Sequence, residues 1–145
     1  MVFAKTISAI SKLLNPREAP KRYRQLFEII REVKPKNIME IGTWTGARAG
    51  EMIEEAKKFH PVKEINYYGF DLFEELSDKD FKKEISKQPP ALALVKKELE
   101  KSGANIHLYK GDTGDVLPRV AAELPPMDFI FIDGGHSLET VENDW

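Results

Sequence analysis

Short apolar runs alternate along the chain with longer segments whose apolar residues recur at helical spacing. The expected strands cover residues 37–41, 64–70, 106–109 and 127–132. The last of these contains FIFI, an uninterrupted apolar run of the kind found in strands buried on both faces of a parallel sheet. Helical spacing predicts helices over 3–14, 19–33, 91–101 and 116–124, and a further helix that follows residue 46 and ends at Phe59.

Helix-breaking residues lie between these segments. Pro35, Pro61 and Gly103 follow three of the expected helices. Pro118 fits near the first turn of the 116–124 helix, because a helix tolerates proline there. Residues 74–90 are polar and end in Pro89-Pro90, which predicts a flexible excursion or a short helix, and a final helix is expected to begin at His136.

Alternation of strand and helix predicts an α/β protein with a Rossmann-like, doubly wound, mostly parallel sheet. We expect N-terminal helices over residues 1–35 and one Rossmann-like domain over 36–145. In such a sheet, ligands bind at the carboxyl ends of the strands. The residues that follow the expected strands are therefore the first candidates for a binding site.

Composition excludes several classes of protein. The chain has 145 residues, 41% of them hydrophobic and 32% charged, which suits one globular domain. Its formal net charge is −2 with no clear basic face, so nucleic acid is not an expected partner. It contains no cysteine, and its N-terminus resembles neither a signal peptide nor a membrane span. We therefore expect a cytoplasmic protein with no membrane partner.

The segment EIGTWTG, which runs from Glu40 to Gly46, follows the first strand. Dinucleotide sites have the spacing Gly-x-Gly-x-x-Gly, and their middle glycine lets the backbone approach the pyrophosphate. When Gly42 is aligned with the first glycine, Trp44 occupies the second position. An indole there takes the space that a pyrophosphate needs, so the loop suits a nucleoside-like ligand without phosphates.

These residues resemble the first motif of class I S-adenosylmethionine-dependent methyltransferases, and among them the small-molecule O-methyltransferases of the caffeoyl-CoA and catechol type. The resemblance implies S-adenosylmethionine as the cofactor, with Glu40 and Gly42 beside its methionine part. Thr43, Trp44 and Gly46 complete the implied binding loop. The alternative is a tight strand-to-helix turn in which Glu40 is a structural hydrogen-bond acceptor.

Two further acidic residues follow strands. Asp71 ends the second strand, where the family places a carboxylate on the ribose hydroxyls, although NAD-binding folds use an acid at the same place. Gly111 and Asp112 follow the third strand, where family members often hold the adenine. Asp71 could instead be a solvent-exposed acid, and Asp112 could cap the next helix.

The fourth strand is followed by Asp133-Gly134-Gly135-His136. In the resembling O-methyltransferases an aspartate here lies beside the cofactor and binds a divalent metal, usually magnesium. The resemblance therefore makes Asp133 a candidate for binding the cofactor, for binding the metal and for catalysis. His136 is a candidate general base or metal ligand. The caffeoyl-CoA type carries aspartate and lysine in place of Gly135 and His136. The alternatives are a helix cap for Asp133 and an exposed first-turn residue for His136.

The resemblance implies a methyltransferase that methylates an oxygen of a small hydroxylated metabolite. Family domains continue with strands beyond the fourth, whereas this sequence ends at Trp145, so that strand is expected at a sheet edge. An apolar edge invites pairing with another chain, so we expect a truncated chain or a homo-oligomer, and the alternative is an N-terminal helix that folds over the edge. The alternative functions are a non-catalytic S-adenosylmethionine-binding or oligomerisation module and, less favoured because of Trp44, an NAD-dependent dehydrogenase.

Overall fold

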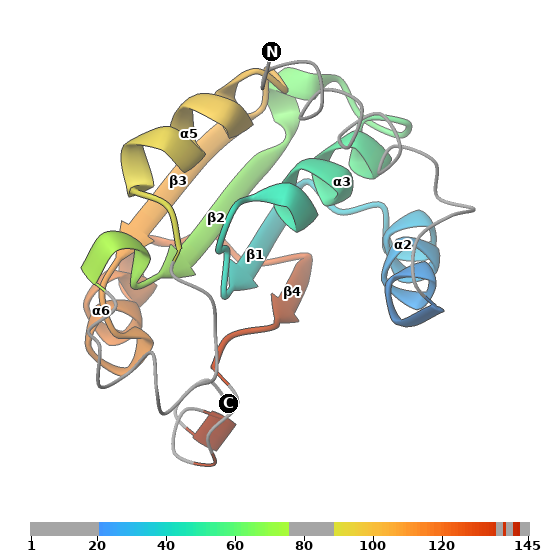
Figure 1. Cartoon of the computed structure of the whole chain (residues 1–145). Helices are drawn as coiled ribbons and strands as arrows, with labels where there is room; N and C mark the ends of the chain where they lie inside the picture. The colour runs from blue at the N-terminus through green and yellow to red at the C-terminus, as the bar shows by residue number, and fades with distance from the viewer. Residues whose placement is uncertain (1–20, 76–88, 136–137, 139–140, 143–145) are drawn as a thin grey trace.

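A parallel sheet of four strands, in the order β3-β2-β1-β4, forms the centre of the computed structural model (Figure 1). The structure describes residues 21–75, 89–135, 138 and 141–142. The strands are β1 Asn37–Ile41, β2 Asn66–Asp71, β3 Asn105–Lys110 and β4 Phe129–Ile132. Every pairing between neighbours is parallel, which confirms the predicted doubly wound α/β fold.

Helices connect the strands and cover both faces of the sheet. The α-helices are α2 Lys21–Val33, α3 Ala47–Ala56, α5 Leu92–Glu100 and α6 Thr113–Val120. Short 3-10 turns cover Val62–Glu64, Phe73–Glu75 and Ala121–Glu123. Among these described helices, none is long and apolar enough to span a bilayer.

The face of the sheet that carries Ile38 and Tyr67 packs against α2, α3 and α5 in one apolar core. The opposite face carries Met39, Ile41, Tyr68 and Phe70, and Val116 of α6 packs on it in a second core. Strand alternation explains this division, because successive side chains of a strand point to opposite faces. Aromatic side chains pair across β2 and β3 on the α6 face, where Tyr68 stacks on His107 with ring centroids 4.7 Å apart.

The observed helix α6 begins earlier than the sequence pattern predicts. It starts at Thr113 because the carboxylate of Asp112 accepts a hydrogen bond from the Gly114 N–H and caps the first turn. Pro118 consequently lies inside the helix and not in its first turn, so that prediction was wrong. The α-helix ends at Val120, and the remaining predicted residues continue as a 3-10 turn.

Other boundaries differ by a few residues. The helix expected to end at Phe59 ends at Ala56, and the second strand begins at Asn66 and not at residue 64. The helix expected over 3–14 lies outside the described residues, as do most of the polar segment 74–90 and the residues at the start of the final helix.

Strand β4 has a single partner, β1, among the described strands and therefore lies at an edge of the described sheet. Its register joins Ile38 to Phe129 and Ile41 to Ile132. The edge position agrees with the expectation for this strand, and the 52% exposed side chain of Ile130 shows that, within the described part of the chain, the strand is not buried on both faces as its composition suggests. The apolar composition of FIFI and this edge position remain in conflict within the described sheet.

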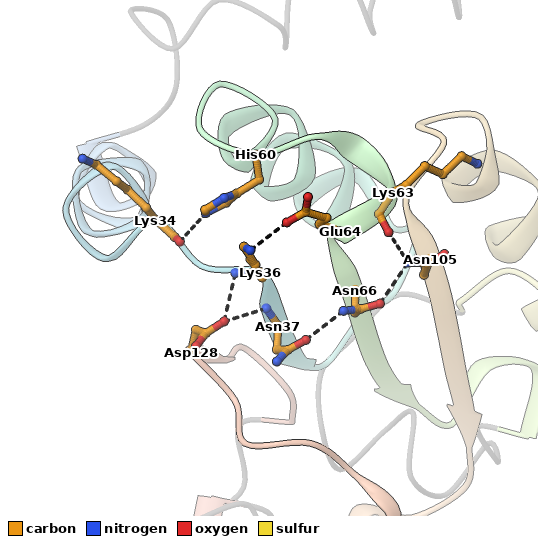
Figure 2. Close-up of polar contacts among 9 residues, drawn as sticks. All are labelled: Lys34, Lys36, Asn37, His60, Lys63, Glu64, Asn66, Asn105 and Asp128. Carbon is orange, nitrogen blue, oxygen red and sulfur yellow. Dashed lines mark hydrogen bonds and ion pairs between the residues drawn. The ribbon is translucent and has the colours of Figure 1, made fainter.

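A row of asparagines crosses the amino ends of three strands (Figure 2). The side-chain amide of Asn66 donates to Asn37 Oδ1 at 2.9 Å, and the amide of Asn105 donates to Asn66 Oδ1 at 3.0 Å. These residues are register partners across β1, β2 and β3. At the end of the row Asp128 accepts hydrogen bonds from the backbone N–H groups of Lys36 and Asn37. The row joins the strand ends opposite the candidate site.

The substitution Asn66→Ala removes two side-chain hydrogen bonds from the centre of this row. We expect it to lower the free energy of unfolding by about 1–2 kcal/mol, measured by urea denaturation. Lys63→Ala is the control, because only the backbone carbonyl of Lys63 takes part in the row. It is expected to change stability by less than about 0.5 kcal/mol. Equal effects of the two substitutions would contradict a stabilising role for the row.

Candidate functional site

The candidate site lies at the carboxyl edge of the sheet, where β1 and β4 are neighbours. The chain proceeds from β1 to β2 to β3 in one direction and then returns to place β4 on the other side of β1. This reversal makes the β1–β4 boundary the topological switch point, where α/β sheets bind ligands. Gly42 follows β1 at this boundary and Asp133 follows β4.

Gly42 is the point of closest approach between the ends of β1 and β4. A Cβ atom built at Gly42 would lie 2.6 Å from the carbonyl carbon of Asp133 and 2.7 Å from the Cα of Gly134. Its φ angle is +94°, a conformation that side chains disfavour. The backbone N–H of Gly42 donates to Phe70 O at 2.8 Å, and the N–H of Asp133 donates to Ile41 O at 2.9 Å. Position 42 therefore requires glycine, because the neighbouring backbone leaves no room for a Cβ atom.

The loop after Gly42 has one buried and one exposed side chain at its centre. Thr43 is buried, whereas the indole of Trp44 is 44% exposed and its backbone has a φ of +46°. The N–H of Gly46 donates to Thr43 O at 2.8 Å and closes the turn. Gly46 then precedes α3 and packs under the side chains of Val95 and Leu99 in α5.

The carboxylate of Asp71 holds this loop against the end of β2. Its Oδ2 accepts a hydrogen bond from the Trp44 N–H at 2.6 Å, and its Oδ1 accepts one from the Phe73 N–H at 3.1 Å. The Trp44 bond fixes the backbone of a residue in the sparsely populated left-handed region. The backbone carbonyl of Asp71 also accepts from the Gly111 N–H at 3.1 Å. Asp71 thus joins the loops that follow β1 and β3.

Glu40 lies in β1 with its side chain buried on the face of the sheet that α3 covers, and it is only 1% exposed. The hydroxyl of Tyr67 in β2 donates to Glu40 Oε2, and the same hydroxyl contacts Thr43 Oγ1 at 3.2 Å. Glu40, Tyr67 and Thr43 therefore form one buried polar cluster beneath the turn at Gly42. The resemblance implied a place for Glu40 beside the cofactor, whereas in this structure its carboxyl group accepts a hydrogen bond from Tyr67.

Burial raises the pKa of the Glu40 carboxyl to about 8. The hydrogen bond from Tyr67 and the positive charge of Arg48 oppose this rise, whereas the negative charges of Asp133 and Asp71 add to it. Burial likewise raises the pKa of the Tyr67 hydroxyl well above its ordinary value. Both groups are therefore predominantly neutral at pH 7.

The residues after β3 have a clear local role. Gly111 has a φ of +131°, and a Cβ there would lie 2.8 Å from Val116 Cγ2. The carboxylate of Asp112 accepts the Gly114 N–H at 2.9 Å as the N-cap of α6. This is the capping alternative that the sequence left open for Asp112, and a capping aspartate keeps further acceptor capacity for a ligand.

Asp133 is exposed at the end of β4, while His136 lies outside the described residues. No group of three or more histidine, cysteine, aspartate or glutamate residues within the described ranges could hold a metal ion. Magnesium in proteins takes oxygen ligands and usually keeps several waters, so one or two carboxylates can hold it, and Asp133 is the described acid at the end of β4.

Two residues of this region were not singled out from the sequence, Tyr67 and Gly69. A Cβ at Gly69 would lie 2.5 Å from Thr43 Oγ1 and 2.8 Å from Tyr67 Cε1, so a side chain there would displace the polar cluster. The available signal was the alternation in β2, which puts Tyr67, Gly69 and Asp71 on one face. A glycine between a tyrosine and an aspartate on one face of a strand predicts that another segment of the chain or a ligand approaches the strand closely at that position.

A family model described as "Methyltransferase domain" matches residues 39–145. The chain therefore belongs to this family of S-adenosylmethionine-dependent methyltransferase domains. No curated protein shows a significant sequence match to the chain.

Solved structures share the fold at low sequence identity. The O-methyltransferase from Bacillus cereus in complex with SAH is 20% identical, with a TM-score of 0.55, and the match covers 89% of this chain and 51% of that one. A Klebsiella pneumoniae protein described as an O-methyltransferase is 19% identical, with a TM-score of 0.51, over 86% of this chain and 52% of that one. The chain thus spans about half the length of these two structures.

The close approach at Gly42 gives a matched pair of glycine substitutions. We expect Gly42→Ala to lower the free energy of unfolding by about 3 kcal/mol or more, because the methyl group overlaps the backbone of Asp133 and Gly134. Gly50→Ala in α3 is the control, since a Cβ there meets no atom within 4 Å. It should raise stability by roughly 0.5–1 kcal/mol. Denaturant unfolding of both variants measures the difference, and a mild effect at Gly42 would contradict the close approach.

The buried Glu40 carboxyl predicts a pH dependence of stability. The folded protein holds this proton up to about pH 8, whereas an unperturbed carboxyl releases it near 4.5. The folded state therefore binds more protons between these values, and the free energy of unfolding falls as the pH rises through this window. Glu40→Gln stays neutral and should flatten this slope. Thermal melting of both proteins across the window measures it, and parallel curves would show that Glu40 ionises normally.

Proposed function

We propose that the chain is the S-adenosylmethionine-binding part of an O-methyltransferase that acts on a small hydroxylated metabolite. The observation that carries the proposal is the hydrogen bond from the Trp44 N–H to the Asp71 carboxylate. It places an acidic residue at the end of β2 directly against the loop EIGTWTG, beside the switch point of a methyltransferase sheet. The SAH complex of the related Bacillus cereus fold supports the same ligand class.

Asp71 is the residue proposed to hold the nucleoside, and Gly42 is proposed to lie beside the methionine part of the cofactor. Both Asp71 oxygens already accept a backbone N–H, but a carboxylate oxygen has more than one acceptor site. The two ribose hydroxyls can therefore donate to Asp71 while the loop stays attached. Trp44 adds bulk at the position where a dinucleotide site has glycine, which favours a ligand without a pyrophosphate.

The cofactor supplies an activated methyl group, so the protein must orient the acceptor oxygen and accept its proton. Asp133 is the described residue best placed for this role, because it is exposed at the end of β4 beside Gly42. His136, three residues later, is the second candidate from the sequence.

A second candidate function is a non-catalytic S-adenosylmethionine-binding or oligomerisation module. It shares the sheet, the switch point and the loop EIGTWTG with the first candidate. The exposed Ile130 at the edge strand β4 also favours self-association within this reading. Binding of the cofactor is common to both candidates, whereas methyl transfer belongs to the first alone.

Asp71→Asn tests the proposed ribose site. It keeps the size of the side chain but removes its charge, and we expect the dissociation constant for S-adenosylhomocysteine to rise on the order of tenfold in calorimetric titration. Asp128→Asn is a matched control, because Asp128 also accepts two backbone N–H groups but lies at the opposite edge of the sheet. It should leave the affinity unchanged.

NAD serves as the competing ligand in the same titrations, and we expect it not to bind. Binding of NAD in place of S-adenosylhomocysteine would overturn the proposal. Transfer of a labelled methyl group to catechols, assayed with and without magnesium, then separates the enzyme from the non-catalytic module. Tight cofactor binding without transfer to any hydroxylated acceptor would favour the module.

A further inference from the structure

We infer that Tyr67 is a positioning residue of the ligand site, because its buried hydroxyl joins the Glu40 carboxyl to the Thr43 hydroxyl and so fixes the turn at Gly42. The inference rests on the proposed function for its ligand, S-adenosylhomocysteine. Tyr67 itself lies one strand away from the loop and acts through Thr43, which the sequence places between Gly42 and Trp44.

The polar cluster is built from three separate segments and is enclosed by apolar side chains. Glu40 comes from β1, Tyr67 from β2 and Thr43 from the loop before α3. Tyr67 is fully buried, and it packs in the same core as Ile38 and Ile53. A buried hydroxyl or carboxyl without a partner destabilises a protein by about 1–3 kcal/mol, so these three groups are held together.

The missing side chain of Gly69 leaves room for the polar cluster. Gly69 is the register partner of Glu40 in the neighbouring strand, and its missing side chain leaves room for Thr43 Oγ1 and the ring of Tyr67. Any larger residue at 69 would place its Cβ 2.5 Å from Thr43 Oγ1. The close fit shows that the hydroxyl of Thr43 has a defined position over β2.

Thr43 is tied to β2 through its side chain and to the loop through its backbone. Its hydroxyl contacts Tyr67, and its carbonyl accepts the N–H of Gly46 at 2.8 Å. The neighbouring Trp44 N–H is held separately by Asp71. Loss of the Tyr67 hydroxyl would therefore release the first half of the loop while the Asp71 contact remains. A preorganised loop binds more tightly because less conformational freedom is lost on binding.

Tyr67→Phe removes the hydroxyl and keeps the ring. We expect amide hydrogen exchange of residues 43–46 to become faster and the dissociation constant for S-adenosylhomocysteine to rise, each on the order of tenfold. The matched control is Tyr68→Phe, the adjacent residue on the opposite face, whose ring stacks on His107. It should change neither quantity.

Thr43→Val removes the other end of the same contact with little change of shape and should reproduce both effects, also where Tyr67→Phe does not fold. Thr43→Ser keeps the hydroxyl and should retain most of the affinity. Unchanged loop exchange in Tyr67→Phe, or equal acceleration in Tyr68→Phe, overturns the inference. If the unmodified protein does not bind S-adenosylhomocysteine, the proposed function fails, and faster loop exchange in Tyr67→Phe alone still supports the positioning role.

Discussion

The close approach of two backbone segments at Gly42 is the constraint on which the candidate site depends. The chain leaving β4 passes so near this residue that a methyl group would overlap Asp133 and Gly134. The same contact brings the residues after β1 and β4 to the switch point of the sheet. A glycine that a sequence motif associates with a ligand is thus required first by the packing of the protein itself.

Around this point two polar side chains on one face of β2 stabilise the loop. The Asp71 carboxylate, at the end of the strand, binds the backbone of Trp44, while the Tyr67 hydroxyl, deep in the core, contacts the side chain of Thr43. The two groups differ in environment, since Asp71 is half-buried and Tyr67 is fully buried. Glu40 tolerates this interior because desolvation raises its pKa to about 8 and keeps it neutral.

Family membership and site geometry address different parts of the function. The match over residues 39–145 assigns the chain to the methyltransferase domains. The similar solved structures, near 20% identity, support the fold and leave the acceptor open. The nucleoside site that we propose lies at one edge of the sheet, and an acid, Asp133, lies beside it.

Local patterns along the sequence determined the order of strands and helices, the parallel sheet and the candidate residues at its carboxyl edge, because periodicity and glycine spacing reflect backbone geometry directly. The same patterns misplaced the start of α6, since the capping bond of Asp112 outweighed the preference of Pro118 for a first turn. The apolar composition of β4 by itself indicated a strand buried on both faces, whereas Ile130 is half exposed, because composition reports the preference of a strand and not the presence of a neighbour.

Only the tertiary structure brought Glu40, Tyr67, Thr43 and Gly69 together. These residues come from β1, β2 and the intervening loop, so their contacts depend on strand register and on the path of the loop over the sheet. Sequence spacing carries no information about which buried hydroxyl meets which carboxyl across two strands. The polar partners of the loop were therefore decided by packing, where a buried polar group must find whichever partner the fold places within reach.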